Sequence, residues 1–155
     1  MAWFQQFWRY GKTFLALVFR RPLVGTTAIP ILADGSIVLA RRRDDGLWSL
    51  PGGLVDWGET IADTLGRELR EETGLQLLAI ERLVGVYSAR DRDPRMHSVC
   101  IAAAVSVAGT PQIQDTLEIG EIRAFPPDFP FGDLHLSHDH ARQLQDYLAG
   151  RTALA

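Results

Sequence analysis

Short apolar segments alternate with turn and loop residues along most of the chain, which predicts strands separated by breakers. Leu23–Leu32 is rich in Val, Thr and Ile and is expected to be a strand. The Asp34–Gly35 pair that follows is a strong turn signal, so Ser36–Arg41 is predicted to pair back as the second arm of a hairpin. Further strands are expected over residues 77–87, 97–107 and 121–125, separated by turn-rich stretches.

A helical pattern is found in two places. Residues 60–73 place Ile61, Leu65 and Leu69 on one side and end at Gly74, which suits a left-handed helix cap. A last helix is expected over residues 139–148, whereas residues 46–53 and 126–132 are expected to be loops. Strands interleaved with helices predict an α/β fold, a mixed β-sheet flanked by helices in a sandwich.

The first 21 residues have a different pattern. Aromatic and aliphatic residues recur there at steps of three and four, basic residues accompany them, and acidic residues are absent. This predicts an amphipathic helix that ends before Pro22. Its longest apolar run, residues 14–19, is far shorter than the roughly 20 residues that span a bilayer. The helix could pack on its own domain or a homodimer partner, or make a peripheral contact with an anionic membrane surface.

Composition narrows the class of protein. The 155 residues suit one domain, and 46% hydrophobic with 23% charged residues are typical of a globular chain with a core. The net charge of −3 gives no basic footprint, so stable nucleic-acid binding is not expected. Cys100 is the one cysteine, which excludes an intrachain disulfide and favours a cytoplasmic location. In an apolar strand, it is expected to be buried rather than a nucleophile.

Three carboxylates gather on the helix predicted over residues 60–73. Glu68, Glu71 and Glu72 fall within about 100° of one face, where they repel one another. A hard divalent cation would neutralise such a cluster, because oxygen ligands suit Mg²⁺ and Mn²⁺. The alternative from charge alone is a solvated acidic face paired with Arg67 and Arg70.

The spacing of these residues is more specific than their charge. The chain reads Gly53, five residues, Glu59, seven residues, Arg67-Glu68-Leu69, one residue, Glu71-Glu72, one residue, Gly74-Leu75. This segment resembles the Nudix box, and the resemblance to the Nudix hydrolase family extends over about residues 22–149. It implies a Nudix-type α/β/α sandwich over 22–149, preceded by the helix of residues 1–21 and followed by a tail, 150–155.

The resemblance implies a function and a cofactor. Nudix hydrolases use Mg²⁺ to cleave the diphosphate bond of a nucleoside diphosphate linked to another moiety; Mn²⁺ is a possible substitute. It implies that Glu72, with Glu68 and Glu71 beside it, holds the metal together with the backbone carbonyl of Gly52. Glu68 could instead act as the base on the attacking water.

Other motif positions carry supporting roles. Glu59 and Arg67 are expected to form the pair that braces the loop against the helix. Gly53 and Gly74 are expected to supply backbone freedom. An additional base is often recruited from a distal loop in this family. Glu118 and Glu121 are the candidates here, and Glu121 is taken as the catalytic one; exposed acids without a role are the alternative.

The segment Arg92-Asp93-Pro94-Arg95 resembles a stretch of some bacterial and archaeal ADP-ribose pyrophosphatases, although the proline that precedes it in them is missing. Arg92 and Arg95 could bind a phosphate or phosphoribosyl group, since arginine matches phosphate geometry; an ordinary charged loop is the alternative. Trp57 is a candidate to stack on a base. A small-molecule nucleotide is thus the expected partner.

ADP-ribose or a related nucleotide sugar is the favoured substrate. A MutT-like triphosphate pyrophosphohydrolase and a non-catalytic nucleotide-binding module are the alternatives. Because all four glutamates of the motif are present, an enzyme is favoured over a silent module. His138 and His140 are spaced like metal ligands but are interpreted as capping and packing residues.

Overall fold

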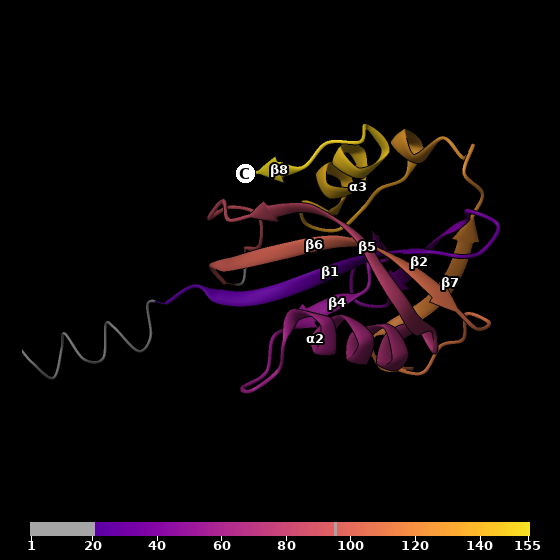
Figure 1. The fold of residues 1–155 in the computed structure, drawn as a ribbon, viewed down its shortest axis with the longest axis horizontal. Helices are drawn as coiled ribbons and strands as arrows, with labels where there is room; N and C mark the ends of the chain where they lie inside the picture. The colour runs from indigo at the N-terminus through magenta and orange to yellow at the C-terminus, as the bar shows by residue number, and fades with distance from the viewer. Residues whose placement is uncertain (1–20, 95) are drawn as a thin grey trace, which may run out of the picture.

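The computed structural model describes residues 21–94 and 96–155, which form one mixed β-sheet with helices on both faces (Figure 1). The predicted fold class is therefore confirmed. The N-terminal helix expected over residues 1–21 lies, apart from its last residue, outside the described residues. The elements are β1 (Leu23–Ile31), β2 (Ile37–Arg42), β3 (Trp48–Ser49), β4 (Gly52–Leu54), α2 (Ile61–Glu68), η1 (Leu69–Thr73), β5 (Gln76–Tyr87), β6 (Ser98–Ala108), β7 (Ile119–Phe125), η2 (Phe131–Asp133), α3 (His140–Leu148) and β8 (Ala153–Leu154).

The sheet is built around β1 and β6, which run parallel at its centre. Its strand order is β3-β2-β1-β6-β5-β8, with β7 paired to β2 and β4 paired to β1. One edge of β1 is shared by two partners: its first half pairs with β4, as in Thr26 opposite Gly53, and Ile31 at its end pairs with Ile37 of β2. Strand β4, which contains the first residue of the Nudix-like segment, is therefore held in the sheet beside β1.

Successive side chains of β1 point to opposite faces of the sheet, and the hydrophobic core accordingly forms two clusters. Ile29 belongs to the cluster between α3 and the sheet, together with Leu39 and Leu144. Its neighbour Ala28 points to the opposite face and joins the cluster between α2 and the sheet, which includes Leu65. Figure 1 shows α2 below the sheet and α3 above it. Both helices are thus fixed by burial on opposite faces of the sheet.

The structure differs from the predicted elements mainly in short strands. The segment expected to be a loop over 46–53 contains β3 and the start of β4, and the tail of residues 150–155 contains β8. Residue 153 pairs with Gly85, and the Ala155 N–H donates to the Val86 carbonyl. Strands of two or three residues are held by tertiary pairing and are too short for a hydrophobic period to reveal. β7 also begins two residues earlier than predicted.

The helix expected over residues 60–73 changes its geometry before it ends. Thr60 caps α2 in a capping box with Asp63. After Glu68 the last five residues form a π-helical turn, inside which the buried Thr73 hydroxyl donates to the Leu69 carbonyl. Gly74 then ends the turn at φ +70°, as the sequence predicts. π-Turns widen a helix and redirect its side chains, and they are frequent at functional sites.

No helix within 21–94 and 96–155 is both long enough and apolar enough to cross a membrane.

Candidate active site

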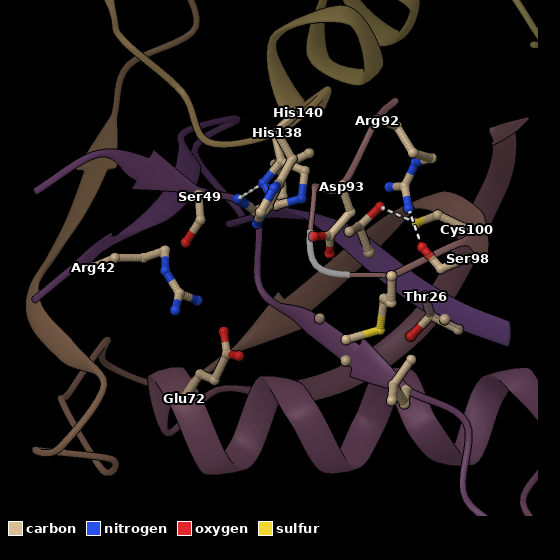
Figure 2. Close-up of a pocket in the computed structure, with 17 residues that line it drawn as sticks. Thr26, Arg42, Ser49, Glu72, Arg92, Asp93, Ser98, Cys100, His138 and His140 are labelled. Carbon is tan, nitrogen blue, oxygen red and sulfur yellow. Dashed lines mark hydrogen bonds between the residues drawn. The ribbon is translucent and has the colours of Figure 1, made fainter. Parts of the chain in front are cut away.

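A cavity of about 140 Å³ opens between the first half of β1, β4, the start of β6 and the loop that precedes α3. It is lined by Gly53 and Glu72 of the Nudix-like segment and by Gly52 just before it, so the motif and the cavity coincide. Figure 2 shows Glu72 projecting into this space from the helix below, Arg42 pointing toward it from β2, and the rings of His138 and His140 above. The lining residues are Gly25, Thr26, Thr27, Arg42, Ser49, Leu50, Gly52, Gly53, Leu54, Glu72, Arg92, Asp93, Met96, Ser98, Cys100, His138 and His140.

Glu72 is the acid that the helix presents to the cavity. The π-turn buries Leu69 and Thr73 against the sheet, which leaves Glu72 between them facing β4. Burial, together with the charge of the nearby Glu68 carboxylate, raises the pKa of Glu72 to about 8. A backbone hydrogen bond from Gly52 lowers that pKa, as does the charge of Arg42. A carboxylate in this position favours a cation beside it, because a cation stabilises the charged form.

Arg67 connects the loop, the helix and the acids of the motif. Its Nε donates to Glu59 at 2.7 Å, its Nη1 to Glu68 at 2.7 Å, and its Nη2 to the Leu54 carbonyl at 3.1 Å. The hydrogen bond with Arg67, assisted by Thr64, lowers the pKa of Glu59 to about 2. The Glu59–Arg67 contact that the motif leads us to expect is present, and it ties the β4–α2 loop to the helix.

Glu68 and Glu71, the other two acids of the helix, have different surroundings from Glu72. Glu68 is 14% exposed, and burial raises its pKa in spite of the Arg67 hydrogen bond. Glu71 is 57% exposed, and its carboxylate lies 3.3 Å from Nη1 of Arg67 on the solvent side of the helix. Of these three acids, Glu72 lines the cavity, Glu68 lies against Gly53 of the cavity wall, and Glu71 is on the solvent side of the helix.

These acids do not form a closed metal cage. Within the described residues, no three His, Cys, Asp or Glu side chains are arranged to hold a metal ion. Arg67 contacts the carboxylates of both Glu68 and Glu71. The donor set nevertheless fits Mg²⁺, which is held by one or two carboxylates together with water and substrate phosphate rather than by a full protein cage. Glu72, Glu68 and the Gly52 carbonyl would supply such a set.

The two glycines of β4 permit close contacts that a Cβ would disturb. A Cβ on Gly52 would lie 2.1 Å from the Thr26 carbonyl oxygen, and a Cβ on Gly53 would lie 2.1 Å from Oε1 of Glu68. Glycine at both positions therefore lets β4 pack between β1 and the helix that carries the acids.

Of the predicted substrate-binding residues, the structure places Arg92 at the cavity and Trp57 away from it. Arg92 lines the cavity, but its guanidinium is bidentate to Asp139 at 2.8 and 2.9 Å and also donates to Ser98 at 2.6 Å. Trp57 is fully exposed at the tip of the β4–α2 loop and does not line the cavity. Arg95 lies outside the described residues. Arg92 thus anchors the loop before α3 to β6.

The two candidate distal bases also differ in their surroundings. Glu121 of β7 is paired with Arg123 and lies 3.5 Å from Arg41, on the outer surface of the sheet. Glu118, in the loop before β7, is close enough to Glu72 for its charge to raise the pKa of Glu72. Of the two, Glu118 is the one coupled to the acid in the cavity.

Sequence reasoning missed the role of Arg42 and interpreted the histidines only in part. Arg42 faces Glu72 across the cavity, and no spacing rule connects β2 to the motif. His140 packs as predicted: it is buried, and its Nδ1 accepts from the Leu50 N–H at 3.1 Å. Burial lowers its pKa to about 3. Cys100 is buried at 3% exposure, as expected.

Comparison with known proteins agrees with this geometry. The Nudix domain matches residues 21–147. The ADP-ribose pyrophosphatase of Methanocaldococcus jannaschii is 35% identical over 140 residues, which cover 84% of this chain and 76% of that protein. A MutT Nudix hydrolase from Burkholderia pseudomallei matches with a TM-score of 0.69 and 30% identity over 81% of this chain and 98% of its own.

A third likeness concerns the fold alone. The Nudix domain of Shewanella oneidensis NrtR, solved in complex with ADP-ribose, gives a TM-score of 0.74 at 23% identity, over 86% of this chain and 90% of that one. Motif, fold and relatives agree, and the chain belongs to the Nudix family. It is an enzyme of the Nudix pyrophosphatase type.

Proposed function

We propose that this protein is a Mg²⁺-dependent hydrolase that cleaves the diphosphate bond of a nucleoside diphosphate linked to another moiety, with ADP-ribose as the favoured substrate. The observation that carries the chemistry is Glu72, a half-buried carboxylate that faces a cavity beside the Gly52 backbone and close to the charge of Glu68. The choice of ADP-ribose is supported by the 35% identity to an ADP-ribose pyrophosphatase across most of the chain.

The metal would be held by Glu72, Glu68 and the Gly52 carbonyl, with Glu71 at the solvent edge. When bound, Mg²⁺ supplies neutralisation of charge on the diphosphate oxygens and acidifies an attacking water. Arg67 orients Glu68 through the 2.7 Å hydrogen bond, and Glu59 in turn holds Arg67. Mn²⁺ has similar ligand preferences and could replace Mg²⁺ in the same oxygen donor set.

The proton of the attacking water needs an acceptor, and three glutamates are candidates. Glu68 is half-buried near the expected metal position but is engaged by Arg67. Glu118 is supported by its electrostatic coupling to Glu72, whereas Glu121 is held by Arg123 and Arg41. A base must come within hydrogen-bond reach of the water it deprotonates, so we assign this role to Glu118 ahead of Glu121.

Substrate contacts are expected at the other walls of the cavity. Arg42 uses Nε and Nη2 on Asp44 and directs the rest of its guanidinium toward Glu72, where substrate phosphate would lie. Arg92, Arg95 and Trp57 remain candidates for binding the group linked to the diphosphate. For Arg92, such binding would require it to share or release Asp139.

Hydrolysis of a substrate panel tests the proposal. The purified chain is incubated with ADP-ribose, NADH, the nucleoside triphosphates or a diadenosine polyphosphate, with Mg²⁺ and with EDTA. Selective turnover of ADP-ribose to AMP and ribose 5-phosphate, lost in EDTA, is expected. Turnover of triphosphates alone would support a hydrolase but would show that its substrates are triphosphates and not ADP-ribose. An intact panel would contradict the proposed enzyme.

A further inference from the structure

Thr26 of β1 has a buried hydroxyl that no protein group satisfies. The residue is 2% exposed, and within residues 21–94 and 96–155 its Oγ1 has no hydrogen-bond partner. A buried polar atom without a partner lowers stability, and such atoms are rare in native proteins. The hydroxyl of Thr26 therefore calls for a partner from outside the folded chain.

The other hydroxyl side chains that line the catalytic cavity are all engaged within the protein. Thr27 donates to Gln143 of α3, Ser49 donates to a backbone carbonyl of β2 at 3.2 Å, and Ser98 accepts from Arg92 at 2.6 Å. The wall of the cavity is thus a bonded structure in which hydroxyls find partners. The missing partner is specific to one position on this wall and does not reflect loose packing around it.

The Thr26 hydroxyl is aimed into the cavity that Glu72 lines. Thr26 lines the same cavity, and Figure 2 shows its oxygen turned toward the side on which Glu72 projects. In the sheet, Thr26 is paired with Gly53, whose missing side chain leaves room for the Glu68 carboxylate. Directly paired residues of an antiparallel pair point to the same face, so Thr26 lies on the face that Glu68 occupies. The hydroxyl is therefore beside the expected metal position.

The chemistry of this end of the cavity indicates which ligand the hydroxyl suits. A threonine hydroxyl can donate one hydrogen bond and can also accept. The oxygens of a diphosphate carry negative charge and only accept, so they would use the proton of the hydroxyl in a charge-assisted hydrogen bond. The proposed function places a diphosphate over Glu72, in the cavity that Thr26 lines. A donor at this position therefore matches the group that the enzyme has to bind.

We propose that Thr26 is a substrate-binding residue whose hydroxyl donates a hydrogen bond to an oxygen of the substrate's diphosphate. The hydroxyl lacks a partner in the ligand-free protein and gains one when the diphosphate binds. A neighbouring side chain must move to admit an oxygen to a group this buried, and Met96, which lines the same cavity, is unbranched and can change rotamer. This inference deepens the proposed function and rests on it for the position of the diphosphate.

Thr26→Val tests the proposal, because valine has nearly the same shape and lacks the hydroxyl, whereas Thr26→Ser retains it. Thr27→Val is the comparison on the same strand, since its hydroxyl is bonded to Gln143. Thr110→Val is the control for activity, because Thr110 is exposed in the loop after β6 and does not line the cavity. The melting temperature without ligand, the Kd for Mg²⁺ alone and the Kd for α,β-methylene-ADP with Mg²⁺ are measured for each variant. The kcat/KM is measured on whichever substrate the wild type hydrolyses.

We expect Thr26→Val to melt about 2–4 °C above the wild type, because an unsatisfied buried hydroxyl is removed. The same variant should bind the analogue about 10- to 100-fold more weakly, with a parallel fall in kcat/KM, as for loss of a charge-assisted hydrogen bond. Its affinity for Mg²⁺ alone should be unchanged. Thr26→Ser should keep most of the analogue affinity, Thr27→Val should melt below the wild type, and Thr110→Val should match it.

Three results would overturn the proposal. A lower melting temperature in Thr26→Val would show that the hydroxyl is already bonded in the ligand-free protein. Wild-type analogue affinity in that variant would show that the diphosphate does not use the hydroxyl, and weaker binding of Mg²⁺ alone would show that the hydroxyl serves the metal instead. Failure of ADP-ribose as substrate is seen separately in the wild type, and turnover of triphosphates in its place leaves the Thr26 test intact, because a triphosphate also contains a diphosphate.

Discussion

Replacement of Gly52 and of Gly53 by alanine should damage the site in two different ways. The added Cβ of Gly52→Ala would lie 2.1 Å from the Thr26 carbonyl oxygen and 2.8 Å from the Thr27 Cα. These are backbone atoms of β1 and cannot rotate away, so the β1–β4 pairing must open. The added Cβ of Gly53→Ala instead meets Oε1 of Glu68 at 2.1 Å, which is the end of a side chain that can move.

The expected loss of stability depends on which atoms the added Cβ displaces. Overpacking against a fixed backbone costs about 1–3 kcal/mol, and 1 kcal/mol lowers the melting temperature by about 2–4 °C in a domain of this size. We therefore expect Gly52→Ala to melt about 2–12 °C lower than the wild type. In Gly53→Ala the Glu68 carboxylate rotates out of its 2.7 Å hydrogen bond with Arg67, so stability changes little while Glu68 leaves its place beside Glu72.

Thermal melting and Mg²⁺-dependent hydrolysis, measured on both variants, check this reasoning. Both variants should lose at least about tenfold in kcat, because each displaces one of the expected metal ligands. Gly132→Ala is the control, since a Cβ at that position meets no atom within 4 Å. Wild-type activity in Gly53→Ala would refute the role given to Glu68, and an unchanged melting temperature in Gly52→Ala would refute the packing argument.

Two further predictions concern the base and the pH dependence of stability. Glu118→Gln should lower kcat by at least about tenfold and Glu121→Gln should not; steady-state kinetics that show the reverse order would restore Glu121 as the base. The folded-state pKa of His140 is about 3, below its unfolded value, so the unfolded state binds the extra proton as pH falls below about 6.5. The buried ring should therefore cost about 2 kcal/mol of stability at pH 5 relative to pH 7, and Glu72, with its raised pKa, acts in the opposite direction. Urea unfolding of the wild type and of His140→Gln at pH 5 and pH 7 measures the contribution of this ring. The same change in the free energy of unfolding between the two pH values in both proteins would contradict the prediction.

The elements that local chemistry specifies could be predicted from the sequence. The Asp34–Gly35 turn forms as expected, with the Ser36 N–H donating to the Asp34 carboxylate and Gly35 at φ +84°. The helix of the Nudix-like motif begins after Thr60, whose capping box is a local interaction of side chain and backbone. The contact between Glu59 and Arg67, which the resemblance to the Nudix family implied, is also present.

Features that depend on distant parts of the chain could not be predicted. Arg42 and Glu72 are thirty residues apart, and the sheet brings them together only because β2 and β4 lie on the same edge of β1. The three glutamates share one face of an ideal α-helix, but the π-turn and Arg67 separate Glu71 from the other two. Arg92 is engaged by Asp139, 47 residues later, and this distance in sequence hides the pairing.

The central claim is that Glu72 binds the catalytic Mg²⁺, and Glu72→Gln tests it most directly. Mg²⁺ titration by calorimetry and ADP-ribose hydrolysis are measured on this variant, with the exposed Glu81→Gln as control. We predict loss of Mg²⁺ binding and a fall of about 10²–10⁴ in kcat for Glu72→Gln, because a metal contributes several kcal/mol to charge stabilisation. The fold should be retained, since a carboxylate that repels Glu68 is replaced by a neutral group of similar shape. Wild-type Mg²⁺ affinity and turnover in Glu72→Gln would contradict the account.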